Sequence, residues 1–161
     1  YQFLRAEGFG PKSAMIGLSR GGLFAWNYAS RFPERVACIY ADNPVCDFKS
    51  WPGGKGSGPG SPNDWKKLLA VYGFKNEAEA LAWPGNPVAA LEPVARAGIP
   101  CLHVCGDADE TVPYRENTAP LAERFRSLGG KIEIILKPGG RHHPHGLEDP
   151  APIVDFILRA F

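Results

Sequence analysis

The 161-residue sequence lacks long hydrophobic runs and any excess of one charge. No apolar stretch approaches the ~20 residues that a membrane-spanning helix needs. Lysine and arginine together number 18, and aspartate and glutamate number 17, so the net charge is +1. This balance gives no electrostatic basis for binding nucleic acid or an acidic membrane surface. We therefore expect neither as a partner, and the oligomeric state stays open.

Cysteine is scarce, and its spacing excludes two common uses. The four cysteines include no C-x-x-C pair, so zinc binding through cysteine is not expected. Cys101 and Cys105 lie in an apolar run typical of a strand, where ~3.3 Å per residue would place their α-carbons roughly 13 Å apart, too far for a disulfide. Cys38 and Cys46 could meet only if the chain turns back after Asp42. We interpret all four as small buried thiols.

The sequence also lacks an initiating methionine. It begins at Tyr1, and residues 1–7 are typical of the end of a helix. We expect on this ground that the chain is a piece of a longer protein. Without the preceding sequence, the presence of a signal peptide and the cellular compartment stay open.

Glycine and proline, by contrast, are abundant at 19 and 16 residues, which indicates many turns. Between the turns stand four short apolar runs, most of them followed by a helical pattern. The predicted strands cover 13–18, 35–41, 99–105 and 131–137. A helix is predicted over 114–128 and a last one over 150–161. Strands that alternate with helices predict a mostly parallel sheet in a three-layer α/β/α fold. Glu133 interrupts the fourth run, which indicates a strand near an edge.

The segment 43–98 is too long for a simple crossover between two strands. It opens with a stretch rich in glycine, proline and serine, 51–62, and Asn63 and Asn76 are plausible N-caps for helices that follow. Three short helices are predicted inside it, over 63–72, 76–83 and 87–97. An insertion at this point of a parallel sheet would lie over the carboxyl ends of the strands, where such sheets bind ligands.

We therefore interpret 43–98 as a lid-like insertion within a single domain, 1–161. The alternative is a flexible surface loop. Its aromatic residues argue against simple disorder.

One motif carries the chemistry of the sequence. Gly17-Leu18-Ser19-Arg20-Gly21 matches G-x-S-x-G and lies between a predicted strand and a predicted helix, as the motif requires. A nucleophile at the tip of so sharp a turn adopts strained backbone angles, and flanking glycines leave room for it. Ser19 would then point off the sheet, and the backbone N–H of Arg20 could stabilise an oxyanion. The alternative is a glycine-rich turn that contains a serine by chance.

A nucleophilic serine needs a base, and the base needs an acid that orients it. Residues 106–113, after the third strand, contain Asp107 and Asp109. Residues 138–145, after the fourth strand, contain three histidines, His142, His143 and His145. Both segments lie just past the carboxyl end of a strand, as Ser19 does. The order serine, acid, histidine is the one expected for this topology.

On these three segments the chain resembles the C-terminal two-thirds of an α/β-hydrolase domain, of the esterase-like or prolyl-oligopeptidase-like kind. The matching residues are Gly17-Leu18-Ser19-Arg20-Gly21-Gly22, 106–113 and Gly139-Gly140-Arg141-His142. The resemblance implies that Asp109, three residues before Val112, is the acid and that His142 is the base. Arg141 departs from the family pattern, which often has glycine there.

Several alternatives stay open beside this assignment. Asp107 competes for the role of the acid, as do Asp42 and Asp47 after the second strand. For the Arg20 side chain, a salt bridge to a neighbouring helix is favoured over contact with the substrate. Residues that could line the pocket or bind substrate are Asn43, Trp51, His143 and His145. His103 lies inside an apolar strand and is interpreted as a core residue.

A metal or organic cofactor is not expected. The three clustered histidines could suggest a metal site, but Pro144 forces an extended bend between them. No cysteine or paired carboxylate lies at ligand spacing.

We predict a serine hydrolase, and specifically a carboxylic-ester hydrolase that works through an acyl-enzyme. Its partner would be a small acyl ester, for which an acylated carbohydrate is an option because aromatic faces suit sugar packing. The alternatives are a serine peptidase of the prolyl-oligopeptidase kind and a non-catalytic domain that retains the fold.

The position of Ser19 near the start of the sequence carries a further expectation. In the α/β-hydrolase family several strands precede the nucleophile, and a loop among them supplies the second oxyanion donor. We expect those strands and that donor to be missing from this sequence, which would leave the first strand as an unpaired edge. The isolated piece is then expected to be poorly stable or inactive.

Overall fold

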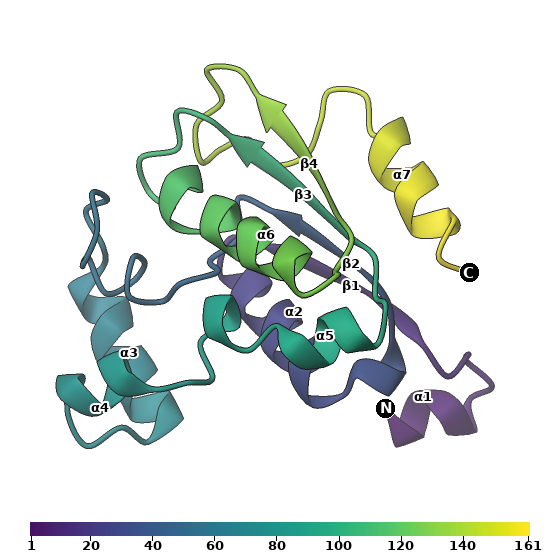
Figure 1. The fold of residues 1–161 in the computed structure, drawn as a ribbon, viewed down its shortest axis with the longest axis horizontal. Coiled ribbons are helices and arrows are strands. Elements are labelled where there is room, and N and C mark those ends of the chain that lie inside the picture. The colour runs from purple at the N-terminus through teal and green to yellow at the C-terminus, as the bar shows by residue number, and fades with distance from the viewer.

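The computed structural model describes all 161 residues and contains one parallel sheet of four strands in the order β1-β2-β3-β4 (Figure 1). The strands are β1 Ser13–Leu18, β2 Val36–Asp42, β3 Cys101–Gly106 and β4 Ile132–Lys137. All three pairings are parallel, so the carboxyl ends of the strands meet at one edge of the sheet. Each strand lies within two residues of a predicted run, and the predicted fold class is confirmed.

Seven α-helices accompany the sheet. They are α1 Gln2–Ala6, α2 Arg20–Arg31, α3 Pro62–Tyr72, α4 Glu77–Ala82, α5 Glu92–Arg96, α6 Thr118–Ser127 and α7 Ala151–Leu158. Three short 3-10 turns cover Pro33–Arg35, Pro87–Ala89 and Tyr114–Glu116. None of these helices is long and apolar enough to cross a membrane.

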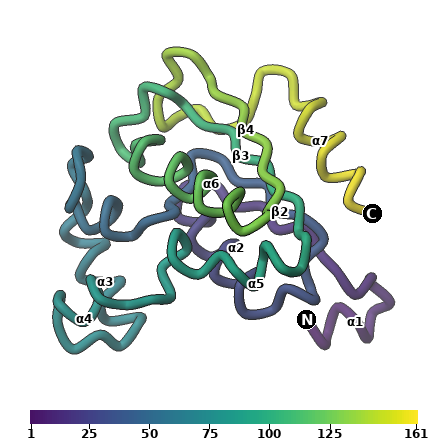
Figure 2. The backbone as a smooth tube through the Cα atoms, viewed as in Figure 1, coloured from purple at the N-terminus to yellow at the C-terminus, as the bar shows by residue number.

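The helices form layers on both faces of the sheet (Figures 1 and 2). One face packs against α2, α5 and α6, and its core includes the fully buried Trp26 and Phe125, whose rings meet edge to face at 5.3 Å. The other face packs against α7 through Ile153 and Phe156. Because β2 and β3 contact both cores, they carry almost uninterrupted apolar residues rather than an alternating pattern.

The two outer strands differ from this pattern. Glu133 is exposed in β4, which lies at one edge of the sheet as its sequence predicted. At the other edge, β1 leaves the side chain of Ile16 57% exposed. Phe24 of α2, the helix that packs against β1, is 66% exposed.

Three helix boundaries differ from the sequence prediction. The N-cap of α3 is Ser61 and not Asn63, because the Ser61 hydroxyl accepts the Asp64 amide and Pro62 is suited to the first helical position. The predicted helix 87–97 divides into a 3-10 turn and α5, which has Pro93 in its first turn. The predicted helical stretch after Tyr114 divides at Asn117, whose backbone leaves the helical region.

The insertion forms a small core of its own. Phe48, Trp65, Leu68 and Ala80 are buried together, with further aromatic rings packed around them. A hydrogen bond of 3.0 Å from the Asn27 amide to the Tyr72 hydroxyl links this unit to α2. The apolar residues of α3 and α4 thus pack within the insertion, which gives the segment a defined structure. Its role as a lid stays a prediction.

His103 is a core residue, as its position in an apolar run predicted. Its ring is fully buried between the Trp26 indole N–H at 3.1 Å and the Thr118 hydroxyl at 2.9 Å. Burial lowers the pKa of His103 to about 3, so the ring stays neutral at physiological pH.

Gly17 offers a test of the turn between β1 and α2. A Cβ atom on Gly17 would lie 2.5 Å from the backbone oxygen of Gly21, whereas a Cβ on Gly21 would meet nothing within 4 Å. Gly17→Ala is therefore expected to lower the free energy of unfolding by about 1–3 kcal/mol, as overpacking does. Gly21→Ala is the matched control and should leave it unchanged or raise it by up to about 1 kcal/mol, since alanine favours helix. Urea unfolding measures both, and equal stability of the two variants would contradict the tight turn.

Candidate active site

Ser19 occupies the sharp turn that joins β1 to α2. Its backbone has φ 51° and ψ −116°, a conformation that side-chain-bearing residues seldom adopt. The turn is held by two hydrogen bonds from amides to the Ser19 carbonyl oxygen, from Gly22 at 2.9 Å and from Val45 at 3.0 Å. A side chain on Gly22 would collide with Pro44. These contacts present the Ser19 hydroxyl at the carboxyl end of the sheet, as the motif predicts.

His142 reaches Ser19 from the loop after β4. Its Nε2 atom lies 2.9 Å from the Ser19 hydroxyl oxygen, across 123 positions of sequence. Its Nδ1 atom lies 2.7 Å from the Oδ2 atom of Asp109 in the loop after β3. The His142 side chain is 12% exposed and that of Asp109 is 1% exposed. One imidazole therefore connects the hydroxyl to a buried carboxylate.

Asp109 is itself fixed by the loop that carries it. Its Oδ1 atom accepts the backbone amides of Thr111 at 2.8 Å and Val112 at 2.9 Å. One carboxylate oxygen is thus occupied by the loop and the other faces His142. This division holds the carboxylate at a fixed angle and favours the tautomer of His142 that carries its proton on Nδ1.

The other acids considered from sequence do not contact His142. Asp107 accepts the Gly139 amide at 2.7 Å and so ties together the loops after β3 and β4. Asp47 accepts the Lys49 amide and the Asn86 side chain. Asp42 faces His145 instead, at 2.8 Å from Nδ1. Of the four carboxylates, Asp109 is the one within hydrogen-bond reach of His142.

Ser19, Asp109 and His142 lie on the loops after β1, β3 and β4 of this parallel sheet. Comparison with known proteins agrees with this fold. Residues 1–73 match the family model described as the alpha/beta hydrolase fold. Acylamino-acid-releasing enzyme 2 of Oryza sativa subsp. japonica is 29% identical over 140 residues, which cover 81% of this chain and 17% of that protein. The chain has the α/β-hydrolase fold.

Solved structures agree on the fold. An acylaminoacyl peptidase of Pyrococcus horikoshii superposes with a TM-score of 0.66 at 17% identity, covering 88% of this chain and 22% of the peptidase. A puromycin hydrolase superposes with a TM-score of 0.69 at 20% identity, covering 97% of this chain and 22% of that protein. The chain thus spans about a fifth of the length of these relatives.

In this fold the Arg20 backbone N–H is the first of helix α2. It has no acceptor within the helix, because the first amides of any helix lack intrahelical partners. It therefore stands free beside Ser19 to receive a developing negative charge, and the positive end of the helix dipole adds to that effect. The Arg20 side chain points elsewhere, with Nη1 at 3.4 Å from Asp64 in α3. The favoured salt bridge to a neighbouring helix is present.

Asn43 has a different role from the one predicted. The prediction that it contacts substrate does not fit its burial, because only 2% of the residue is exposed. Its side-chain amide donates to the carbonyl oxygens of Arg141 and His142, at 3.1 and 2.9 Å, and its oxygen accepts the Gly106 amide at 2.7 Å. With φ at 40°, Asn43 adopts the left-handed conformation that asparagine tolerates. It anchors the backbone that carries the histidines.

Asp42 is a second anchor that sequence reasoning missed in this role. It is fully buried at the end of β2 and contacts His145 at 2.8 Å, the Gly146 amide at 2.7 Å and the Tyr40 hydroxyl at 2.9 Å. Burial, together with the negative charge of Asp42, raises the pKa of Tyr40, so this phenol remains a donor. An aspartate that closes an otherwise apolar strand is the signal that could have identified it.

The remaining candidates lie around this centre. His143 is exposed and, with Arg141 and Thr111, lines a depression of about 260 Å³ beside His142. Trp51 is half-buried, and its ring centre lies 5.8 Å from the Arg20 guanidinium. Both remain predicted contacts for substrate.

The Gly/Pro/Ser-rich segment of the insertion lies against the loop after β3. Gly58 comes close to the backbone of Glu110 and Thr111. Glu116 accepts hydrogen bonds from Ser57 of this segment and from Ser50 directly before it. Burial acts to raise the pKa of Glu116, but these hydrogen bonds outweigh it and the pKa is lowered. A charged Glu116 therefore fastens the insertion beside the Asp109 loop.

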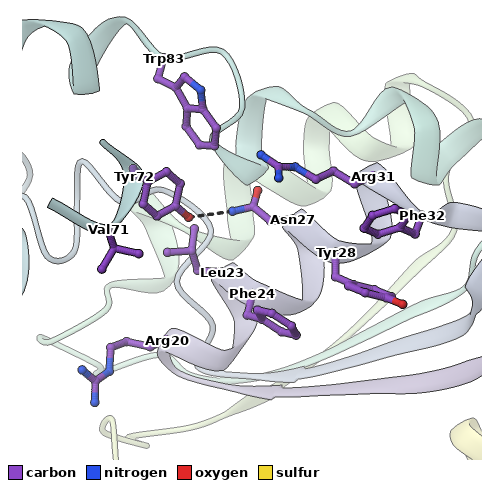
Figure 3. A pocket seen from close by; sticks show the side chains of 10 residues that line it. All are labelled: Arg20, Leu23, Phe24, Asn27, Tyr28, Arg31, Phe32, Val71, Tyr72 and Trp83. Atoms are coloured by element: carbon purple, nitrogen blue, oxygen red, sulfur yellow. Dashed lines mark hydrogen bonds between the residues drawn. The ribbon is translucent and has the colours of Figure 1, made fainter. Parts of the chain in front are cut away.

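A separate apolar pocket of about 690 Å³ opens between α2 and the insertion (Figure 3). Its walls include Phe24 and Tyr28 of α2 and Tyr72 and Trp83 of the insertion. Arg20 lies at its border, but Ser19, Asp109 and His142 do not line it. The pocket is therefore a neighbour of the candidate active site and not the place where Ser19 would meet a substrate.

Proposed function

We propose that this chain carries the catalytic residues of a serine peptidase, one that cleaves an acyl-amino acid or short acyl-peptide amide through an acyl-enzyme. The observation that carries the proposal is the continuous hydrogen-bonded series from the Ser19 hydroxyl through His142 to Asp109. The names of the relatives, acylamino-acid-releasing enzyme and acylaminoacyl peptidase, favour amide over ester substrates. They support the peptidase alternative better than the ester hydrolase that the sequence alone favoured.

The proposed mechanism begins with proton transfer from Ser19. The Oγ atom attacks the acyl carbon while His142 Nε2 takes its proton, and Asp109 stabilises the resulting imidazolium. The oxyanion that forms on the former carbonyl is met by the Arg20 N–H. His142 then donates the proton to the leaving amine, the C–N bond breaks, and the acyl group remains on Ser19. Water, deprotonated by His142, releases it in a second passage through the same steps.

The chain's own anchors support this mechanism. His142 must exchange a proton with two partners in turn, so its ring has to stay in place while its charge changes. The Asn43 side-chain amide holds the main-chain carbonyl oxygen of His142, and the Asp109 carboxylate holds the Nδ1 atom of its ring. Such positioning contributes strongly to the reaction rate, because a misplacement of about 1 Å can lower the rate by roughly 10²-fold.

A matched pair of substrates tests the substrate class. N-acetyl-alanine p-nitroanilide and N-acetyl-alanine p-nitrophenyl ester form the same acyl-enzyme but differ in the leaving group. For a peptidase we expect hydrolysis of both in the purified protein, because His142 can protonate the poor amine leaving group. Release of p-nitrophenol without release of p-nitroaniline would favour the ester hydrolase instead. Absence of both products, with no labelling of Ser19 by a fluorophosphonate, would indicate a non-catalytic domain.

A further inference from the structure

Three histidines gather in the loop after β4. One ring nitrogen from each of His142, His143 and His145 lies within 4.8 Å of the others. Their ring centres are 4.6–5.3 Å apart, and each pair of rings meets edge to face. The sequence had indicated that Pro144 would separate these side chains. In the folded loop, however, the three rings converge on one point.

Two of these imidazoles are supported by buried carboxylates. His142 Nδ1 contacts Asp109 at 2.7 Å, and His145 Nδ1 contacts Asp42 at 2.8 Å. Both carboxylates are nearly or fully buried, at 1% and 0% side-chain exposure. A histidine that binds a metal through one ring nitrogen commonly donates the other N–H to a carboxylate in this way, which fixes the tautomer and raises its basicity. Nε2 is therefore the atom that each of these two rings would offer to a cation.

We propose that His142, His143 and His145 bind one divalent cation of the Zn²⁺ type and that this binding inhibits the active site. Imidazole nitrogen is a good ligand for Zn²⁺, Ni²⁺ and Cu²⁺, whereas Mg²⁺ and Ca²⁺ prefer oxygen. Three histidines would leave the fourth position of a tetrahedral ion to water.

The site requires a small contraction to close on the ion. Zn–N distances of ~2.0–2.1 Å in a tetrahedral arrangement place the nitrogens roughly 3.4 Å apart. The nitrogens, which lie up to 4.8 Å apart, must therefore approach one another. His143 is exposed and free to rotate toward the other two rings, which are held by their carboxylates. The His143 side chain makes no hydrogen bond, so the movement needed falls on it.

Inhibition would follow because the cation would bind the same nitrogen, His142 Nε2, that takes the Ser19 proton. His142 Nε2 also faces the Ser19 hydroxyl, at 2.9 Å. A lone pair bound to a metal ion cannot accept the Ser19 proton, so the metal-bound state would be inactive. The binding part of this inference stands on the histidine geometry alone, whereas the inhibition part rests on the proposed function.

Isothermal titration with ZnCl₂ tests binding in the purified, chelator-washed protein. We expect one Zn²⁺ per chain and no heat of binding with MgCl₂. His143→Gln should weaken the affinity by about tenfold or more, at least the loss that follows removal of a supporting contact to a metal ligand. Because His143 is exposed, this variant should fold normally, which its circular dichroism checks. Lys131→Gln, an exposed change on another loop, is the control and should bind Zn²⁺ as the unaltered protein does.

The second arm measures amide and ester hydrolysis with and without Zn²⁺. Inhibition that EDTA reverses, and that needs at least tenfold more Zn²⁺ in His143→Gln, would support the proposal. Activity that Zn²⁺ leaves unchanged, or Zn²⁺ binding equal in His143→Gln and the unaltered protein, would overturn it. Stoichiometric, His143-dependent Zn²⁺ binding by a protein without hydrolase activity would retain the metal site and reject the proposed function.

Discussion

Replacing Ser19 by alanine is expected to lower kcat for an acyl substrate by about 10⁶-fold, the loss that follows removal of a triad serine. The hydroxyl is the only nucleophile that the geometry places beside His142 Nε2, at 2.9 Å. Without it no acyl-enzyme can form, and what remains is the electrostatic contribution of the Arg20 N–H and of binding. Steady-state hydrolysis of the N-acetyl-alanine p-nitroanilide and ester pair measures the loss.

A second serine on the same helix supplies the control. Ser30 lies in α2, where its hydroxyl donates to the carbonyl oxygen of Asn27 at 3.0 Å, far in sequence from the turn. Ser30→Ala should hydrolyse the substrates at the unaltered rate and should still react with a fluorophosphonate. Ser19→Ala should not react. Retention of more than a thousandth of the activity in Ser19→Ala would assign the nucleophile to another residue.

Asp109→Asn is expected to lower kcat by about 10⁴-fold, because an asparagine at this position favours the wrong tautomer of the histidine. The Asp109 carboxylate accepts the His142 Nδ1–H, and an amide in its place can offer N–H in that direction. The single oxygen of the asparagine amide, in the place of Oδ1, would still accept the Thr111 and Val112 amides. The loop should therefore keep its shape, and the loss should fall on kcat with little change in KM.

Asp107→Asn is the matched control, since it alters the same loop by the same chemistry. Asp107 accepts the Gly139 amide and does not contact His142. Its substitution should change kcat by less than about tenfold, on the scale of one exposed hydrogen bond. Equal losses in the two variants would mean that the loop as a whole, and not the Asp109 carboxylate, supports the histidine. A large loss in Asp107→Asn alone would transfer the role of the acid to Asp107.

Local chemistry made much of this molecule predictable. The four strands are short apolar runs bounded by turn residues, and β2 and β3 lack alternation because both of their faces are buried. The edge position of β4 followed from one charged residue, Glu133. The Ser19 turn could be identified because its strain demands small neighbours: the position of Gly17 leaves no room for a Cβ.

Helix ends were less predictable, because several residues suit each end and either a local or a long-range contact decides among them. Asn63 was also suited to an N-cap, but Ser61 caps α3. The Ser61 hydroxyl accepts the hydrogen bond of the Asp64 amide. The helical stretch after Tyr114 divides at Asn117, because its side chain accepts the amides of Cys46 and Asp47 in the insertion. No local pattern announces such a contact between segments 70 residues apart.

The sequence by itself determined the fold class and the chemical kind of the candidate site, because periodicity, turn residues and motif spacing are local properties. Only the tertiary structure decided which acid faces which histidine. Asp109 reaches His142, and Asp42 reaches His145, because parallel strands bring loops far apart in sequence to one edge of the sheet. The same convergence buried Asn43 as an anchor of the histidine loop. The folding of that loop gathered three imidazoles that Pro144 was predicted to keep apart.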